Sequence, residues 1–503
     1  MRLPILPPAG LVSDETTFAS PGVWADGSNV RFWRGKAQVI GGWVSATTTA
    51  LTGVCRSILP WVDNDGDSVI AFGTHSALQV LKGGTVTDIT PTTLYAGNID
   101  SAGGPGFGVG GYGSGAYSGG ITTEWWARTW SLSNWGEALI ANPRGGTIYY
   151  WDNNPANKAA AIANAPDLVT YAMVTPERQV LAFGCNEELS NVFNPMCIRG
   201  SDIANYNDWT TSPGNNVFEH ILEGSGRIVG AAMLGAYVAV WTDTSCYLGQ
   251  FIGSGGQAYR FDLVAENCGL LGPHAVTVVN GTAYWLTPDL TPYQWSLGGA
   301  PTPIPCPIRN EFVANFEIGQ AEKAVACSNG RFGEVWFFYP DSRDGIENSR
   351  YIALSLYDGA WFRGHLARTA AVDAGPTANP LWVTYSGDCY WHETGNSANG
   401  SEIAWHIETS AQYLNDAQDR VLIRGIWPDF EDQQGTVSLT IKYRAYPQAA
   451  ERTKGPYSLT VGTSKRDFLA DGRIAALRFS GSSAPASIHF GKPTLDVVLT
   501  GAK

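Results

Sequence analysis

The sequence predicts an all-β protein, and three observations lead to this prediction. The 503 residues include 59 Gly and 19 Trp but only 15% charged residues, a composition that favours strands and tight turns over helices. Short apolar runs bounded by turn residues recur every 35 to 55 residues, roughly the spacing of β-propeller blades. The C-terminal part alternates apolar and polar side chains, as half-buried strands do. We therefore predict a degenerate β-propeller of six or seven blades, followed by a C-terminal β-sandwich-like domain.

The first residues, 1–29, are expected to form an extended N-terminal arm. They begin with "MRLPILPPAG", in which prolines interrupt the apolar stretch, so the continuous apolar core of a signal peptide is missing. The sequence contains no run of about 18 apolar residues, and no transmembrane helix is expected. We expect the chain to be made in the cytoplasm.

The propeller is expected over residues 30–395. Residues 55–90 read as four short strands separated by an acidic turn, a small turn and a Gly-Gly turn, which makes one blade. Residues 129–152 make another blade, in which "ALIAN" and "TIYYWD" are adjacent strands joined by "PRGG", with Trp130 and Trp135 covering the blade face. An enclosed barrel or stacked sandwiches fit this local pattern almost as well. The same order of strands and turns returns at 179–186, 230–253, 275–299, 323–341, 350–364 and 380–395.

A glycine-rich segment, "SAGGPGFGVGGYGSGAYSGG" at 101–120, interrupts the propeller. It is half glycine and uncharged, so it cannot bury enough side-chain area to offset its backbone entropy, and we expect a flexible insertion. It contains a G-x-G-x-x-G match at Gly106, Gly108 and Gly111. A dinucleotide site needs that motif between a strand and the start of a helix, and no helical pattern follows here.

A C-terminal β-rich domain is expected over residues 396–503. The segment "NSANGSEI" after Gly395 reads as a linker. Beyond it, four stretches alternate apolar and polar residues: "VSLTIKYRAY", "YSLTVG", "RIAALRFSG" and "ASIHFGKPTLDVVLTG". This pattern predicts a separate sandwich.

The net charge of −13 argues against a surface that grips nucleic acid by neutralising phosphates. A contact along which DNA slides is compatible with this charge, because an acidic wall repels the phosphate backbone. The commoner meaning of such a charge is solubility.

Motifs for catalysis and metal binding are few. The sequence has no G-x-S-x-G elbow and no Walker A lysine. In "DNDGDS" (63–68) the glycine position and the missing closing glutamate favour an acidic hairpin turn over a calcium loop. "HETG" (392–395) lacks the second histidine of H-E-x-x-H. The eight cysteines stand singly and are expected to be buried as small hydrophobes. We predict no catalytic, cofactor-binding or metal-binding residue and no cofactor.

Two alternatives to a structural role stay open. Propeller enzymes that cleave sugars need a pair of carboxylates, which the fold could bring together from distant positions. "SDIANYNDWT" (201–210) weakly resembles the Asp-box of those enzymes, but it lacks the Gly-x-Thr-Trp ending, and such boxes are structural turns. The chain could also be a glycan- or receptor-binding module whose exposed tryptophans stack on sugars or bases, although packing within blades explains most of them. The tryptophans concerned are Trp125, Trp126, Trp130, Trp135, Trp285, Trp295, Trp336, Trp361, Trp382 and Trp391.

Three stretches resemble the tail hub or nozzle proteins of short-tailed bacteriophages, also called packaged-DNA stabilisation proteins. "VRFWRGKAQVIGGW" (30–43) is similar to an early strand pair of that family that ends in a Gly-rich turn. "RIVGAAMLGAYVAVWTDTSCYLGQF" (227–251) is similar to its central strand pair around a Thr-Ser-x-Tyr element, and "DGRIAALRFSGSSAPASIHFGKPTLDVVL" (471–499) to its closing strands. The resemblance covers most of the chain in outline and brings over no catalytic or metal residue.

The resemblance implies a structural protein of the virion that forms a ring, typically of six copies. Such a ring lies below the portal and adaptor proteins and above fibre, spike or needle proteins, helps to retain the packaged DNA and extends its exit channel. Double-stranded DNA would pass through without sequence-specific contacts, and no membrane span is implied. The glycine-rich insertion has no counterpart in that family. We predict it as a loop that contacts the lumen or a partner, through Gly103, Gly106, Phe107, Gly108, Tyr112 and Tyr117.

Overall fold

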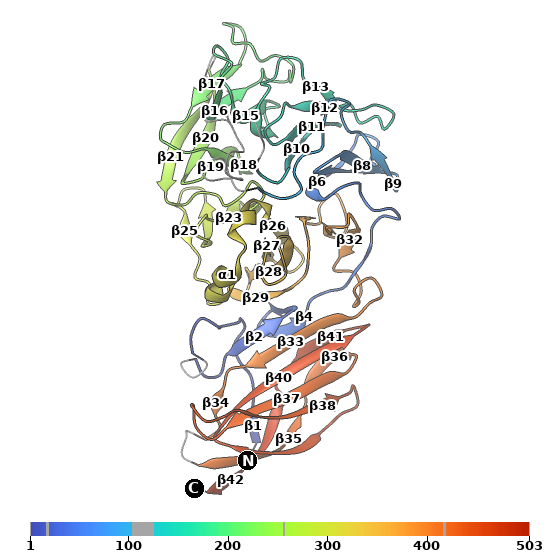
Figure 1. Cartoon of the computed structure of the whole chain (residues 1–503), viewed down its shortest axis with the longest axis vertical. Helices are drawn as coiled ribbons and strands as arrows, with labels where there is room; N and C mark the ends of the chain where they lie inside the picture. Colours follow the sequence, from blue (N-terminus) through green and yellow to red (C-terminus); the bar gives the residue numbers. More distant parts are fainter. Residues whose placement is uncertain (1, 17–19, 103–124, 255–256, 416–418, 502–503) are drawn as a thin grey trace, which may run out of the picture.

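The computed structural model describes residues 2–16, 20–102, 125–254, 257–415 and 419–501. The chain forms two parts stacked along the long axis of the molecule (Figure 1). A ring of blades occupies one end, and a β-rich module that contains both chain termini occupies the other. Strands account for nearly all regular structure, and the described helices are α1 (Arg309–Asn315) and the 3-10 segment η1 (Ile318–Lys323).

The ring is a seven-bladed β-propeller within the described residues. Each blade is a four-stranded antiparallel sheet. The innermost strands of successive blades lie next to one another and close a circle, because β30 of the last blade lies against β6 of the first. An open stack of sandwiches has no such closure. The all-β propeller prediction is confirmed.

The strands of the blades follow chain order. Blade 1 contains β6 (Cys55–Val62), β7 (Ser68–Thr74), β8 (Leu78–Lys82) and β9 (Thr85–Asp88); blade 2 contains β10 (Trp130–Trp135), β11 (Ala138–Pro143), β12 (Tyr149–Trp151) and β13 (Ala160–Ala161). Blade 3 contains β14 (Val169–Val174), β15 (Val180–Asn186), β16 (Phe193–Gly200) and β17 (Phe218–Ile221); blade 4 contains β18 (Ile228–Leu234), β19 (Tyr237–Thr242), β20 (Ser245–Ser254) and β21 (Gln257–Glu266). Blade 5 contains β22 (Val276–Val279), β23 (Thr282–Leu286), β24 (Pro292–Ser296) and β25 (Thr302–Pro303); blade 6 contains β26 (Val325–Asn329), β27 (Glu334–Pro340), β28 (Asn348–Ser355) and β29 (Ala360–His365).

Blade 7 closes the ring with a strand from near the start of the chain. It contains β30 (Ala370–Val372), β31 (Leu381–Val383), β32 (Cys389–His392) and, as its outer strand, β5 (Trp43–Ser45). Val44 pairs with Trp391 in this register. The backbone hydrogen bonds of β5 therefore tie the first residues of the propeller to its last ones.

The predicted blade at 129–152 is confirmed as blade 2. β10 and β11 pair from Trp130 with Pro143 to Trp135 with Ala138. Both tryptophans are buried, and the indole N–H of Trp130 donates to the carbonyl of Thr74 in blade 1 (N···O 2.7 Å). A Cβ atom on Gly73 would lie 2.5 Å from the Trp130 ring, so glycine is needed there for the two blades to pack.

The module is built from both ends of the chain. Its strands form three sheets, and in each of them at least one strand from the first 39 residues pairs with strands that follow residue 402. The first sheet contains β2 (Trp24–Ser28), β33 (Ile403–Thr409), β40 (Ile474–Ser483), β37 (Val437–Arg444) and β38 (Arg452–Leu459), with β34 (Gln412–Tyr413) paired to β40. The second sheet contains β1 (Arg2–Pro4), β42 (Thr494–Gly501), β35 (Arg420–Trp427) and β39 (Arg466–Gly472). The third sheet contains β3 (Val30–Trp33), β4 (Lys36–Val39), β41 (Ser487–Phe490) and β36 (Phe430–Gln434).

The division expected from the sequence, 1–29, 30–395 and 396–503, differs from this strand pairing. The arm residues contribute β1 and β2 to sheets of the module, and β3 and β4, which fall in the range expected for the propeller, belong to one sheet with β41 and β36 through the pairing of β4 with β41. Pairing between strands more than 350 residues apart leaves no local pattern, so the alternation of side chains could not reveal it.

Candidate functional site

The predicted contact residues Gly103, Gly106, Phe107, Gly108, Tyr112 and Tyr117 lie outside the described residues. The residues that flank this insertion are held together. The backbone N–H of Ala102 donates to the carbonyl of Trp125 (N···O 2.7 Å). The side chain of Gln320 exchanges two hydrogen bonds with the backbone of Ser101, at 2.9 and 2.8 Å. The base of the insertion is therefore fixed on η1.

The segment η1 joins several blades through its charged end. The buried ammonium group of Lys323 donates to Asp100 Oδ1 (2.6 Å) and to the carbonyl of Ile346 (2.8 Å). Asp100 lies between blades 1 and 2, and Ile346 lies between β27 and β28 of blade 6. A Cβ atom on Gly272, before blade 5, would lie 2.9 Å from the Cα atom of Glu322. Three separate parts of the ring therefore meet at η1.

Arginines from three further positions in the ring neutralise Glu322 of η1 and Glu347, which precedes β28 and lies beside Lys323. Arg144, from the loop after β11, and Arg227, before β18, both bind the carboxylate of Glu322; the Arg227 contact is 3.0 Å. Arg56, in β6, makes a bidentate pair with Glu347 (2.7 Å to each oxygen). Arg56 and Arg144 are fully buried. We call these groups, together with Asp100 and Lys323, the hub cluster.

Two half-buried tryptophans that follow the insertion cover this cluster. The guanidinium of Arg144 lies 4.7 Å from the Trp126 ring, and that of Arg227 lies 5.0 Å from the Trp125 ring. Cation–π contacts of this kind stabilise a partly desolvated arginine. The Trp-Trp pair therefore packs on charged residues at the base of the insertion rather than within a strand.

Burial and the nearby arginines shift the pKa values of Glu347 and of the neighbouring His274. Burial alone raises the pKa of Glu347, but its hydrogen bonds and charge interaction with Arg56 outweigh this effect and lower the pKa. Burial, together with the positive charges of Arg144 and Arg56, lowers the pKa of the neighbouring His274 to about 4. His274 is therefore neutral near pH 7, while Glu347 stays ionised.

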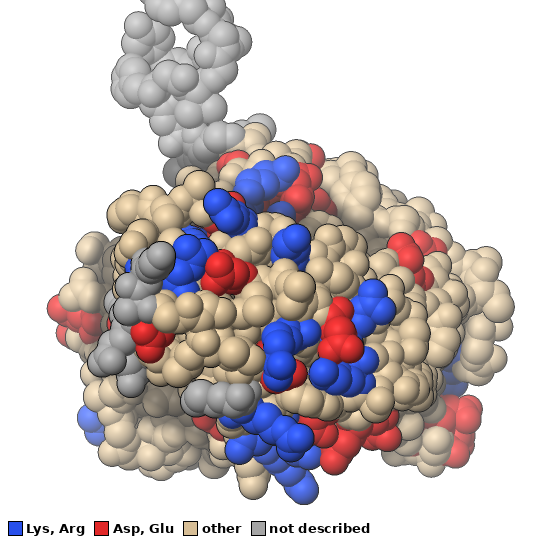
Figure 2. Space-filling model, turned by 90° about the horizontal axis from the view of Figure 1, so that it is seen from below, with Lys and Arg blue, Asp and Glu red and all other residues tan. Residues whose placement is uncertain are grey.

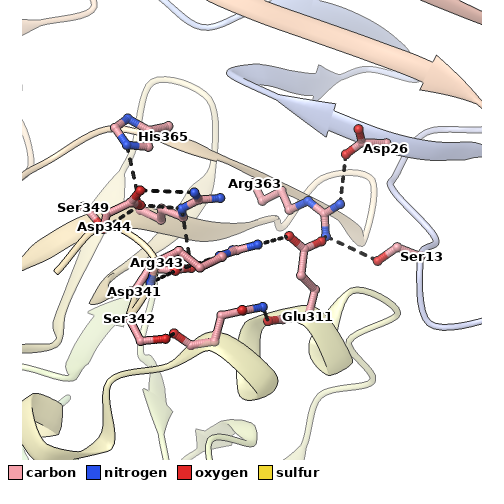
Figure 3. Close-up of polar contacts among 12 residues, drawn as sticks. Ser13, Asp26, Glu311, Asp341, Ser342, Arg343, Asp344, Ser349, Arg363 and His365 are labelled. Atoms are coloured by element: carbon pink, nitrogen blue, oxygen red, sulfur yellow. Dashed lines mark hydrogen bonds and ion pairs between the residues drawn. The ribbon is translucent and has the colours of Figure 1, made fainter.

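A second charged cluster lies where the propeller meets the module (Figure 3). Arg343 makes a bidentate pair with the buried carboxylate of Asp341 (2.8 and 2.7 Å) and also binds Glu311 of α1 (3.0 Å). Arg363 of β29 binds Glu311 and reaches Asp26 of β2 (2.9 Å). This series of ion pairs, with alternating positive and negative side chains, connects blade 6, α1 and the module.

Asp26 of β2 links this series of ion pairs to the module. It accepts from Arg363, from Arg478 of β40 (3.2 Å) and from the ring nitrogen of His406 in β33 (3.0 Å). Burial alone raises the pKa of Asp26, but His406 and Arg363 outweigh it and hold the pKa well below its usual range. A cavity of about 220 Å³ lies among these residues. Every arginine and carboxylate named here has a partner, so the cluster acts as a joint between the two parts.

A third cluster places two carboxylates on one arginine. The buried Arg31 of β3 binds Glu334 of β27 (3.1 Å) and also Glu393, which follows β32. Burial raises the pKa of Glu334 to about 7, the Glu393 carboxylate adds to the rise, and Arg31 opposes it. Because Glu334 is fully buried, its carboxylate is closed to a substrate.

Several sequence motifs acquire structural roles. In "HETG", His392 stacks between Trp43 and Trp382, with ring centroids 5.1 and 3.9 Å away, and Glu393 binds Arg31. In "DNDGDS", Asp63 accepts from the backbone N–H groups of Asp65 and Asp67, which confirms an acidic hairpin turn. Seven of the eight cysteines are buried, all are free thiols, and Cys306 is half-buried.

The weak Asp-box resemblance corresponds to the turns between β16 and β17. There Asp202 accepts from the backbone of Asn216 (2.8 Å), and Asp208 accepts from Asn215 (3.1 Å). The segment thus holds a loop in place. Among the described residues no group of three or more His, Cys, Asp or Glu side chains could hold a metal ion. The described helices are all too short or too polar to span a membrane.

The two parts of the molecule differ in charge. Residues 40–395 contain 16 Lys and Arg against 31 Asp and Glu, whereas the remaining residues contain 16 against 14. Much of the propeller's positive charge is internal, since Arg56, Arg144, Arg199 and Lys323 are buried, while acidic residues such as Asp152 are exposed. Figure 2 views the molecule from the module end and shows both signs of charge interspersed over a largely uncharged face.

None of the three clusters was found from the sequence. Their charged residues come from positions up to 452 residues apart, and single arginines and glutamates among apolar strands carry no motif. The one available signal was an Arg or Glu inside an otherwise apolar strand, such as Arg31 in "VRFW" or Glu334 in "EVWFFYP". A charged residue at such a position has to be paired when it is buried.

Comparisons with known proteins leave the chain without a family. No family model and no curated protein matches it. Among solved structures, it is similar to Kluyvelomyces marxianus Hsv2, with 8% sequence identity, a TM-score of 0.32, and coverage of 56% of this chain and 71% of that one. A likeness at this level supports no conclusion about function.

Proposed function

We propose that the chain is a structural protein of a bacteriophage virion that assembles into a ring in the tail, typically of six copies. The ring acts as a nozzle or hub that extends the DNA exit channel and helps to retain the packaged genome. Portal or adaptor proteins lie above it, and fibre, spike or needle proteins lie below. This proposal starts from the resemblance of residues 30–43, 227–251 and 471–499 to that family.

The observation that favours a structural role most is the hub cluster. A glycan-cleaving propeller enzyme needs accessible carboxylates near its axis, one of them free to accept or donate a proton. Here Glu322 and Glu347 are bound by arginines from blades 1, 2 and 4. These two carboxylates therefore hold the ring together instead of facing a substrate.

The charge distribution supports passage of DNA. A propeller with 31 acidic and 16 basic residues, several of the latter buried, repels phosphate if it lines the channel. The module is close to neutral overall and offers both signs of charge to neighbouring proteins. We therefore expect the propeller to face the lumen and the module to face tail proteins.

The test is negative-stain electron microscopy of the purified chain, with its mass in solution measured by light scattering. We expect rings of about six copies around an open channel. The opposite result is a monodisperse monomer that releases reducing sugars from a panel of glycans, as the enzyme alternative predicts. A ring whose lumen is lined by Lys and Arg would contradict the DNA-passage role while keeping the assembly.

A further inference from the structure

A cavity of about 400 Å³ opens between the propeller and the module. Pockets that bind small molecules often lie at such junctions and have similar volumes. β3, β4 and β41 of the module form one side, and the loop between β26 and β27 together with the segment after β32 forms the other. Each part alone presents only half of the lining.

One wall of the cavity is aromatic. The half-buried rings of Trp33 and Phe332 meet edge to face, with centroids 5.5 Å apart. The Arg31 guanidinium lies 3.9 Å from the centroid of the Phe332 ring. Ion pairs with Glu334 and Glu393 hold Arg31 in place, and Arg31 in turn fixes the position of the Phe332 ring. The aromatic wall is therefore held in place before any ligand arrives.

The polar groups of the cavity have spare hydrogen-bonding capacity, and most of it is donor capacity. The Glu393 carboxylate lines the cavity but is occupied by Arg31 and Asn329. Arg331 is exposed and uses one N–H group on the carbonyl of Glu393 (3.1 Å). His489 uses Nδ1 on Asp432 (3.2 Å), which leaves Nε2.

Two neutral side chains complete the set. Within the described part of the chain, no hydrogen bond engages the side-chain amide of Gln38 or the hydroxyl of Ser487. Gln38 is only 8% exposed, and it pairs across the sheet with His489, so the two side chains stand on the same face. The amide group of Gln38 is accessible from the cavity, so it is free to donate to or accept from a ligand there.

We propose that this cavity binds an anionic saccharide, a sugar unit with a carboxylate such as a hexuronic acid. Its apolar face packs on Trp33 and Phe332, its carboxylate binds Arg331, and its hydroxyl groups bind Gln38, Ser487 and His489. The site goes beyond the proposed ring function, which needs no small ligand. It would give the tail a contact with an acidic glycan of a cell surface.

The test is isothermal titration of the full-length chain with trigalacturonic acid, and with galactotriose as its uncharged counterpart. We expect trigalacturonic acid to bind with a Kd in the micromolar to millimolar range, and galactotriose to bind at least tenfold more weakly. Arg331→Ala is expected to weaken binding roughly tenfold and Gln38→Leu several-fold. Lys36→Ala is the matched control: it removes an exposed positive charge on the same strand as Gln38, outside the cavity.

Three results would overturn the proposal: no binding of trigalacturonic acid at millimolar concentration, equal affinity for galactotriose, or an unchanged Kd in Arg331→Ala. Because Arg331 is exposed, this variant is expected to fold, and it carries the test even if Gln38→Leu does not fold. Rings that form normally while the sugar fails to bind would overturn the glycan site alone and leave the proposed structural function intact.

Discussion

The propeller and the module use strands in different ways. In β7 of the propeller, the six residues from Val69 to Thr74 are all buried, because each blade packs against a neighbour on both faces. In β37 of the module, buried residues alternate with half-buried ones along all eight positions. A sheet packed on one face needs only every second side chain to be apolar. Strand β7 therefore depends on packing at six consecutive positions, whereas β37 tolerates polar residues on one face.

The same contrast holds for charged groups. In the propeller, Arg56, Arg144 and Lys323 are buried and tie several blades together at the hub. In the module, the pair of Lys36 and Glu431 lies largely in solvent, with 54% and 63% of the two side chains exposed. Buried ion pairs are costly to break, and exposed ones are not. Neutralising a single charged side chain should therefore lower the free energy of unfolding far more in the propeller than in the module.

The largest effect is expected from Glu322→Gln. It removes the charge that neutralises the buried Arg144 and is expected to lower the free energy of unfolding by about 3 to 5 kcal/mol. Glu431→Gln in the module is the matched change and should cost less than about 1 kcal/mol, because both side chains of its pair with Lys36 are exposed. Urea unfolding of the two variants, followed by tryptophan fluorescence, measures both. Equal losses would remove the contrast between hub and module.

Alanine substitutions at adjacent strand positions sharpen the comparison of burial. In β7, Ile70→Ala and Phe72→Ala are each expected to cost about 2 to 5 kcal/mol, and Val69→Ala somewhat less, because both faces of the strand are packed. In β37, Leu439→Ala should cost a similar amount and Thr440→Ala less than about 0.5 kcal/mol. Thermal unfolding midpoints test this ranking. A neutral Val69→Ala together with a costly Ile70→Ala would show that the propeller strand is packed on one face only.

The hub cluster should also make the protein sensitive to acid through His274. Its pKa in the folded protein is about 4, below the value of 6.5 for a free histidine, so the unfolded chain takes up the proton first as the pH falls. Stability is therefore lost between pH 6.5 and pH 4, by up to about 3 kcal/mol, and the loss is absent above pH 7.

The measurement is the unfolding midpoint from pH 7.5 to pH 4.5 for the natural chain and for His274→Gln. The variant is expected to lose less stability over this range. His392, whose pKa is also lowered by burial, acts in the same direction in both proteins, so the difference between them isolates His274. Parallel curves would contradict this role of His274.

The smallest effect is expected from replacing residues 103–124 by two glycines. Ala102 and Trp125 are already joined by a backbone hydrogen bond, and a two-residue Gly-Gly turn spans such a pair. The free energy of unfolding should change by less than about 1 kcal/mol. A large loss, measured by thermal unfolding, would mean that the insertion is part of the propeller's core. Loss of ring assembly with unchanged stability would instead support the predicted partner contact of this loop.

The local features of this protein could be predicted because they depend on residues close together in the chain. Apolar runs such as "SVIAFGT", turns such as "PRGG" and the repeat spacing predict strands, hairpins and blades, and blade 2 lies where the sequence placed it. The alternation in "VSLTIKYR" likewise predicts a sheet with one buried face. Hairpins form between neighbouring residues, so composition and period carry this information.

What only the tertiary structure decided are the contacts between distant residues. The closure of blade 7 by β5, the supply of β1 to β4 to the module, and the pairing of Arg31 with Glu393 join residues more than 340 positions apart. The hub cluster likewise needs arginines from three blades to meet at η1. The sequence by itself determined an all-β chain of repeated blades with a second β-rich part. It could not determine the joints, because a buried charge leaves no period in the sequence and its partner is chosen by packing in space.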